Sequence, residues 1–145
     1  MVTLLLADER VDPKIADQDG ATALMFAAVK GHASVVTLLL ADERVDPNIA
    51  DQKGFTALMF AADSVPVVTL LLANDRVDPN MASQKGVTAL MIAAKEGHSP
   101  VVTLLLGDER VDPDLTNQHG RTAITYASLN RHDSVVKLLL ADDAV

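Results

Sequence analysis

Histidines are the side chains of this sequence best suited to bind a metal ion. His32, His98 and His132 stand at the same place in three similar stretches of sequence, so a shared zinc ion is the chemistry to consider. The ligands of one zinc ion each lie about 2 Å from it, whereas stacked helices lie roughly 8–10 Å apart. Histidines from different stretches therefore cannot share an ion, and we interpret them as structural residues.

Aspartates and glutamates form the second group that could carry chemistry. Residues 17–28 begin like a calcium loop, but the bidentate acid that an EF-hand needs at its twelfth position is replaced by Ala28. Asp-Glu-Arg-Val-Asp occurs at 8–12, 42–46 and 108–112 without a partner base. We expect solvated loops there, with aspartate–arginine ion pairs that contribute little to stability.

The sequence contains no motif for catalysis or for a cofactor. Its 145 residues include no cysteine, which excludes disulfides, thiolate zinc sites and thiol nucleophiles. There is no phosphate loop, no H-E-x-x-H and no G-x-S-x-G. We therefore predict a protein that is not an enzyme and that needs no cofactor and no metal.

Charge and hydropathy restrict the partners and the compartment. The net charge of −8 has the wrong sign for nucleic acid or an anionic membrane, and it favours basic proteins or peptides. The N-terminal residues lack the basic segment and the cleavage site of a signal peptide. The longest apolar run, residues 65–73 with Thr69 as an interruption, is far too short to span a membrane. We expect an intracellular, cytoplasmic protein.

A repeat of about 34 residues organises the whole sequence. Residues 35–48 recur in near-copy at 67–80 and 101–114, and a clipped version stands at 2–14. Four turn glycines follow the same register at spacings of 34, 32 and 34: Gly20, Gly54, Gly86 and Gly120. Because each unit of such an array buries its apolar face against its neighbours, we predict an elongated stack.

One unit contains two short helices and a loop. Asp17 to Gly20 form a turn, Thr22 is a natural N-cap, and Gly31 is expected to end the first helix in the left-handed conformation. Ser34 is expected to cap a second helix over residues 35–41. An extended loop then leads to the next turn.

This unit resembles the ankyrin repeat, and the resemblance covers the whole chain. It implies an all-α repeat solenoid, a stack of helix-turn-helix units joined by extended hairpin-like loops. The matching residues of one unit are Asp17, Gly20, Thr22, Leu24, Ala27, Ala28, Gly31, His32, Val35, Val36, Leu38, Leu39, Leu40, Asp46 and Asn48.

We divide this single domain of residues 1–145 into five parts. These are a half repeat (1–16), a repeat (17–50), a shortened repeat (51–82), a repeat (83–116) and a C-terminal repeat (117–145). Because the sequence opens inside a second helix, we expect a fragment or a chain cut on its N-terminal side.

Two units depart from the pattern between their helices. The second lacks the Gly-His pair, so we predict a shortened first helix there and a second helix that begins at Pro66. The fourth has Arg131 in place of glycine, and the neighbouring Asn130 is expected to take the left-handed conformation instead.

Two apolar stripes run in register through the units. Each stripe could be core between repeats or an apolar strip on the concave face. One stripe consists of Met25, Met59 and Met91, and the other of Phe26, Phe60, Ile92 and Tyr126.

Positions that differ between the repeats are the candidates for partner binding. The resemblance implies that turn tips and first helices line a concave groove that contacts partners, although neutral drift on a solvated surface would produce the same variation. Phe55 and Arg121 are the strongest candidates, because aromatic and arginine side chains dominate binding energy. The full set is Asp19, Ala21, Val29, Lys30, Lys53, Phe55, Asp63, Lys85, Val87, Lys95, Glu96, His119, Arg121, Leu129 and Asn130.

We therefore predict recognition of a partner protein or peptide through this groove, without nucleic acid or membrane. Two alternatives remain open at this point. The apolar residues Leu4, Leu5 and Leu6 could mediate self-association. The near-identical copies also permit a recognition scaffold without a natural partner, made by design or selection.

Overall fold

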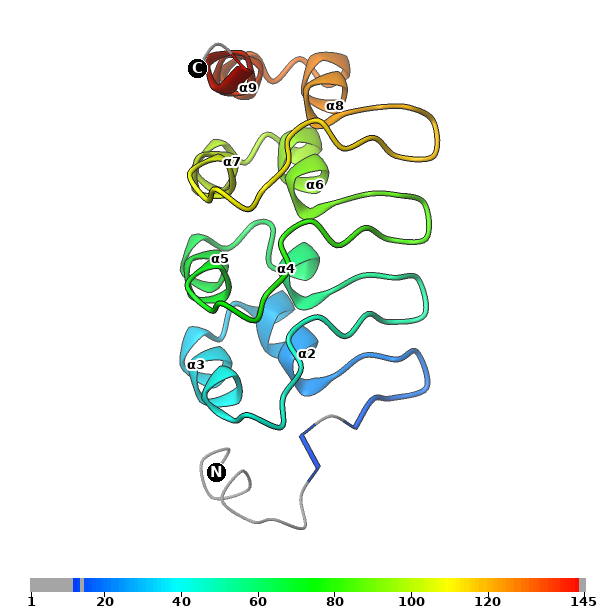
Figure 1. Cartoon of the computed structure of the whole chain (residues 1–145), viewed down its shortest axis with the longest axis vertical. Coiled ribbons are helices and arrows are strands. Elements are labelled where there is room, and N and C mark those ends of the chain that lie inside the picture. Colours follow the sequence, from blue (N-terminus) through cyan, green and yellow to red (C-terminus); the bar gives the residue numbers. More distant parts are fainter. Residues whose placement is uncertain (1–11, 14, 144–145) are drawn as a thin grey trace.

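The computed structural model describes residues 12–13 and 15–143, which form a regular stack of helix pairs (Figure 1). The described helices pair in chain order, and we call each pair with its preceding hairpin a unit. The four pairs are α2 (Ala23–Lys30) with α3 (Ala33–Ala41), α4 (Ala57–Phe60) with α5 (Val65–Leu72), α6 (Ala89–Glu96) with α7 (Ser99–Leu106), and α8 (Ala123–Leu129) with α9 (Asp133–Asp143).

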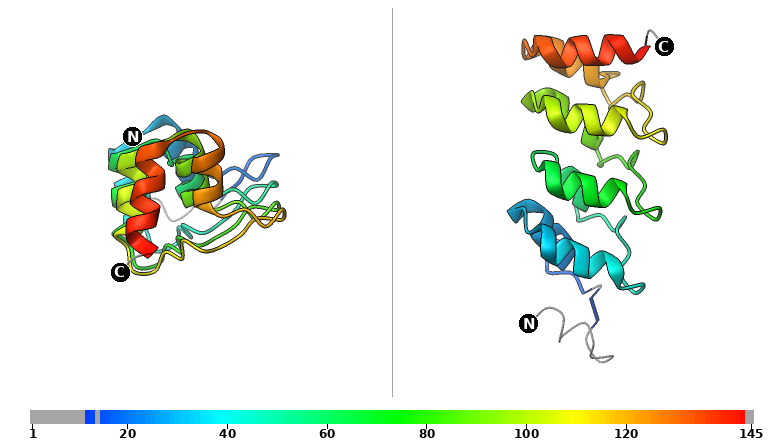
Figure 2. Two further views of the ribbon diagram at one scale, coloured as in Figure 1. Left: turned by 90° about the horizontal axis from the view of Figure 1, so that it is seen from above. Right: turned by 90° about the vertical axis from the view of Figure 1, so that its left-hand side faces the viewer.

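The helices form two layers from which the hairpins project. Figures 1 and 2 show α2, α4, α6 and α8 in one column, α3, α5, α7 and α9 in the other, and hairpin loops extending sideways from the first column. This arrangement confirms the predicted all-α repeat solenoid. In the part of the chain that the structure describes, no helix is long and apolar enough to cross a membrane.

The core runs through the stack between the two helix layers. The methionine stripe belongs to it, because Met25, Met59 and Met91 are each no more than 4% exposed. From the second helices, Leu71 and Leu105 are completely buried. Each helix is too short to be stable alone, so burial against neighbouring units supplies the stability that the individual helices lack.

The ends of the first unit's helices follow the sequence pattern with one exception. The Thr22 hydroxyl accepts a hydrogen bond from the Met25 amide, and Gly31 ends α2 with φ 70°, as predicted. The second helix, however, begins at Ala33 with His32 at the N-cap position, so the prediction that Ser34 caps it is wrong. The left-handed glycine reverses the chain so sharply that α3 starts at once.

The second unit has the shortened first helix that its missing Gly-His pair predicted. Helix α4 contains four residues, whereas α2 and α6 contain eight each. The Ser64 hydroxyl then caps α5 by accepting a bond from the Val67 amide, which makes Val65 the first helical residue. Pro66 therefore takes the second position and not the first, where its missing N–H is equally harmless.

The fourth unit solves its missing glycine differently from our expectation. Arg131 itself adopts the left-handed conformation with φ 59°, while Asn130 has φ −97°. The Asn130 side-chain amide instead donates to the Tyr126 carbonyl. Arg131 stands at the position that Gly31 and Gly97 take in the first and third units, so the fourth unit keeps the left-handed reversal there although this residue has a side chain.

The apolar residues proposed for self-association, Leu4, Leu5 and Leu6, lie outside the described residues, so that alternative stays a prediction.

Candidate interaction surface

Each hairpin tip is shaped by a polar side chain that binds the backbone of its own turn. One carboxylate oxygen of Asp17 accepts bonds from the amides of Asp19 and Ala21, both at 2.9 Å. Asp51 makes the same two bonds in the second unit, to the amides of Lys53 and Phe55. Ser83 and Asn117 take this role in the third and fourth units. The tips thus share one conformation.

Neighbouring tips are joined by hydrogen bonds between their backbones. The amides of Gln52, Gln84 and Gln118 donate to the carbonyls of the preceding tips at 2.9, 3.0 and 3.0 Å. Those carbonyls belong to Asp19, Lys53 and Lys85, whose side chains stay exposed. The backbone of the tips is therefore fixed while their variable side chains face solvent.

Glutamine side chains add further hydrogen bonds between neighbouring tips. The side-chain amides of Gln52 and Gln84 donate to the backbone carbonyls of Gln18 and Gln52. Gln118 differs, because its amide contacts the His119 ring. Gln52 and Gln84 therefore have a structural role in joining neighbouring tips.

Glycine is required at the inner tips because the next unit comes very close. At Gly54, which has φ 84°, an added Cβ would lie 2.8 Å from the Gln84 amide nitrogen. At Gly120 in the last described tip, nothing lies within 4 Å of such an atom. An inner tip thus needs glycine because the next tip packs closely against it, and this need is absent at Gly120.

Most of the variable positions predicted for partner binding are exposed at the tips and first helices. Ala21, Phe55 and Val87 are only partly exposed. The ring of Phe55, one of the two strongest candidates, packs against Phe60 with ring centroids 5.8 Å apart. The exposed members are Asp19, Val29, Lys30, Lys53, Asp63, Lys85, Lys95, Glu96, His119, Arg121, Leu129 and Asn130.

An apolar hollow of about 400 Å³ lies between the tips and the first helices of the second to fourth units. It is bordered by the second apolar stripe, whose members Phe60, Ile92 and Tyr126 are partly buried. Phe26, the first member of that stripe, is 54% exposed. This stripe thus lies partly on the surface, unlike the methionines. The complete lining is Phe55, Met59, Phe60, Val87, Met91, Ile92, Lys95, Glu96 and Tyr126.

A second hollow of about 340 Å³ adjoins the first where α4 is short. It lies between Val29 of the first unit and Glu96 and His98 of the third. Phe60 and Ile92 line both hollows. The turn of helix that the second unit lacks would stand between those neighbours, so its absence opens the first-helix layer. Sequence reasoning found the short helix but not the recess beside it.

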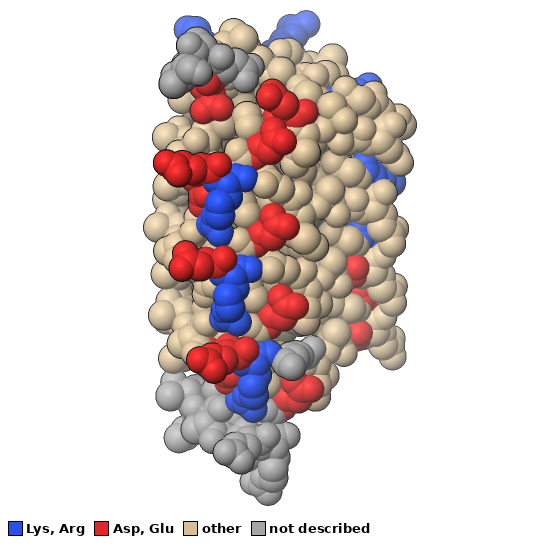
Figure 3. Space-filling view, viewed as in Figure 1, with Lys and Arg blue, Asp and Glu red and all other residues tan. Residues whose placement is uncertain are grey.

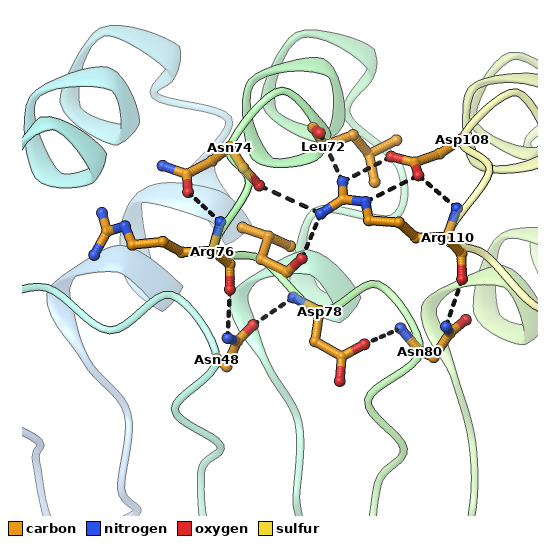
Figure 4. A network of polar contacts seen from close by, with 9 residues as sticks. Asn48, Leu72, Asn74, Arg76, Asp78, Asn80, Asp108 and Arg110 are labelled. Carbon is orange, nitrogen blue, oxygen red and sulfur yellow. Dashed lines mark hydrogen bonds and ion pairs between the residues drawn. The ribbon is translucent and has the colours of Figure 1, made fainter.

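A separate polar network joins the loops that follow the second helices. Figure 3 shows this face, where acidic and basic side chains alternate along the stack. Arg110 donates to the carbonyls of Leu72 and Val77 in the preceding unit, both at 2.7 Å (Figure 4). Arg76 donates in the same way to the carbonyls of Leu40 and Val45.

Carboxylates two residues earlier in the loop bind two of the loop arginines, Arg44 and Arg110. Asp108 forms an ion pair with Arg110 at 2.7 Å, and Asp42 forms one with Arg44 at the same distance. The hydrogen bonds from the Arg44 side chain lower the pKa of Asp42 to about 2, and those from Arg110 lower the pKa of Asp108. The predicted aspartate–arginine pairs are thus present.

Asparagines complete the network by using both ends of their amides. The Asn48 side chain donates to the Arg76 carbonyl and accepts from the Asp78 amide, each at 2.7 Å. Asn80 repeats both bonds one unit later, with Arg110 and Asp112. Sequence reasoning missed these contacts between units, although Arg recurs at the same offset in all three loops and Asn in the first two, which was a signal for them.

Three histidines, His32, His98 and His132, lie at the turns between the paired helices. His132 contacts the Lys95 carbonyl through Nε2 at 2.8 Å, and its ring lies against Gly97. His32 and His98 occupy N-cap positions of second helices. Among the residues that the structure describes, no group of histidine and acidic side chains could hold a metal ion.

The architecture is thus an all-α array of two-helix units with projecting hairpins. The family model described as ankyrin repeats (3 copies) matches residues 1–81 and again residues 64–145. The chain belongs to the ankyrin repeat family. Ankyrin repeats are generally protein–protein interaction modules and typically have no enzymatic activity. A comparison with curated proteins found no match.

Proposed function

We propose that this protein recognises a segment of a partner protein through its concave groove, formed by the hairpin tips and the first helices of the four units. The observation that carries the proposal is that the side chains which vary between units are exposed on a row of tips whose backbone is hydrogen-bonded from unit to unit. Such a row presents variable chemistry on a rigid support, which lowers the entropy cost of binding.

The apolar hollow supports the same surface. Large exposed apolar patches on soluble proteins often mark interaction sites, and here Phe26, Val29 and Leu129 add exposed apolar area on the first helices. The loop face offers fewer side chains for binding a partner, because Arg76 and Arg110 already donate to backbone carbonyls. Binding through the groove is therefore favoured over binding through the loops.

The experiment is a selection of displayed random peptides on the immobilised chain, followed by affinity measurements with variants. The groove variant is Phe55→Ala with Arg121→Ala. Its matched control is Leu140→Ala with Lys137→Ala, which changes one exposed apolar and one exposed basic side chain on α9. We expect the groove variant to bind the selected peptides at least tenfold more weakly, as loss of central anchors does.

Folding is checked separately. Phe55 packs on Phe60, so the double variant can melt at a lower temperature, and the affinities are compared where circular dichroism shows both variants fully folded. Arg121→Ala alone changes only an exposed side chain and gives a second reading. Equal affinity of the groove variant, the control and the unchanged protein would contradict the groove.

A further inference from the structure

The charges of this acidic protein are distributed unevenly. The loops after the first three second helices, residues 42–48, 74–80 and 108–114, contain nine acidic residues and three arginines. Two of those arginines, Arg76 and Arg110, donate to backbone carbonyls of the preceding unit. Much of the net charge of −8 is thus carried by loops that are not part of the groove.

Within the groove, the sign of the charge changes along the stack. The tips and first helices of the first two units, residues 17–31 and 51–63, contain four acidic and two basic residues. Those of the third and fourth units, residues 83–97 and 117–131, contain one acidic residue, Glu96, and four basic ones. The basic residues are Lys85, Lys95, Arg121 and Arg131.

These four basic side chains are available to a partner. All four are exposed, and none forms an ion pair with any residue that the structure describes. The tip residue Asp51 of the second unit has no charged counterpart in the third and fourth, where Ser83 and Asn117 make the same turn bonds without a charge. The C-terminal half of the groove consequently has an excess of basic side chains that acidic neighbours do not neutralise.

The apolar hollow lies where the charge changes sign. Its lining includes Phe55 and Phe60 from the second unit, Ile92 and Lys95 from the third and Tyr126 from the fourth. Its volume of about 400 Å³ is within the range of pockets that enclose small ligands. An aromatic side chain of a partner that entered it would have its neighbours on one side over the basic half of the groove.

We propose that the partner segment is acidic, with an aromatic or large aliphatic side chain that enters the hollow and with aspartates or glutamates that lie over Lys85, Lys95, Arg121 and Arg131. This inference rests on the proposed function and specifies its partner. It is opposite to what the net charge alone favours, because exposed charges beyond the Debye length of about 8 Å are largely screened at physiological salt. The local charge of the groove, and not the net charge of the protein, therefore determines which charge the partner segment carries.

The same peptide selection tests the proposal through composition. We expect the selected peptides to be enriched in acidic residues beside an aromatic or large aliphatic one. Replacing that apolar residue of the peptide by alanine should weaken binding about tenfold or more. Raising the salt concentration should weaken it further, because the exposed charges are screened.

Charge reversal in the protein provides the matched test. Arg121→Glu should weaken a selected acidic peptide about tenfold or more, since it places like charges opposite each other. Lys137→Glu changes the net charge by the same amount on the exposed surface of α9 and should leave the affinity within about twofold. Both variants change an exposed side chain, so folding is not at risk.

The outcomes separate the two proposals. Peptides that need the groove but are basic or neutral, or that ignore Arg121→Glu, overturn the acidic partner and leave groove recognition intact. A lack of selected peptides, or peptides insensitive to every groove variant, overturns both. A short single-stranded oligonucleotide serves as a non-protein polyanion, and binding equal to that of the peptides would overturn the assignment to a protein partner.

Discussion

Single residues in this protein follow the requirements of the backbone of the stack. The first helices of the first and third units end on glycines with φ 70° and 74°, and the fourth unit places Arg131 in the same conformation with φ 59°. For a residue with a Cβ, the left-handed conformation costs roughly 1–2 kcal/mol. In the fourth unit, the reversal into the second helix therefore lowers the stability of the fold locally, because Arg131 adopts a strained backbone conformation.

This cost predicts opposite effects for two adjacent substitutions. Arg131→Gly should raise the free energy of unfolding by about 0.5–1 kcal/mol, because relief of the backbone strain exceeds the entropy that glycine adds to the unfolded chain. Asn130→Gly should lower it by a similar amount or more, since Asn130 is not left-handed and its amide bond to Tyr126 is lost. Urea denaturation of both variants measures this, and equal effects would contradict the assignment.

Sequence reasoning at this scale was reliable where the cause is local. The cap at Thr22 and the stop at Gly31 depend on residues within one turn of helix, so the pattern identified both. It failed at Arg131, because the choice between adjacent residues is made by packing against other units. The contacts of Arg110 across 33–38 residues were missed as well, because the recurring arginines indicate a shared role but not which carbonyls of another unit they bind.

At the scale of elements, α4 shows how one deletion reshapes a surface. Two residues fewer between the helices leave four helical residues in place of eight. The flanking units keep their full-length helices, so a recess opens beside α4 on the groove side. The short helix was predictable from the missing Gly-His pair. The recess was not, because it also depends on the positions of α2 and α6, which do not move in to fill the space.

Helix α4 should also be less protected from hydrogen exchange than α6, the other inner helix of the first-helix layer. Amides in residues 57–63 should exchange with solvent faster than the corresponding amides in residues 89–96, because a four-residue helix contains fewer internal hydrogen bonds to break before opening. Comparing α4 with α6 avoids the ends of the stack. Native-state hydrogen exchange followed by mass spectrometry measures this, and equal protection in both helices would contradict it.

At the scale of the molecule, stability depends on contacts between neighbouring units. Arrays of this kind behave approximately as a sum of unit stabilities and interface terms. Arg110 and Asn80 join the third unit to the second through several hydrogen bonds, and Asn48 and Arg76 do the same one unit earlier. The resemblance identified the stack, but not the particular side chains that couple its units.

Weakening one interface should therefore divide the unfolding transition. Tyr126 is the only tyrosine and there is no tryptophan, so its fluorescence reports on the fourth unit alone, while circular dichroism reports on all helices. In the unchanged protein the two denaturant midpoints should coincide. In Arg110→Ala with Asn80→Ala they should separate, with a loss of about 1–3 kcal/mol. The exposed Glu109→Ala is the control, and coincident midpoints in the double variant would contradict the coupling.

The direction of the arginine bonds also gives the molecule an order of assembly in time. The carbonyls of Leu72 and Val77 are synthesised 38 and 33 residues before the Arg110 that binds them. At a synthesis rate of about 5–20 residues per second, the donor follows roughly 2–8 s later. The carbonyls of Leu72 and Val77 therefore cannot receive these bonds until the following unit has been synthesised. We expect these bonds to form from the N-terminal units toward the C-terminal ones during synthesis, because each arginine is made after the carbonyls to which it donates.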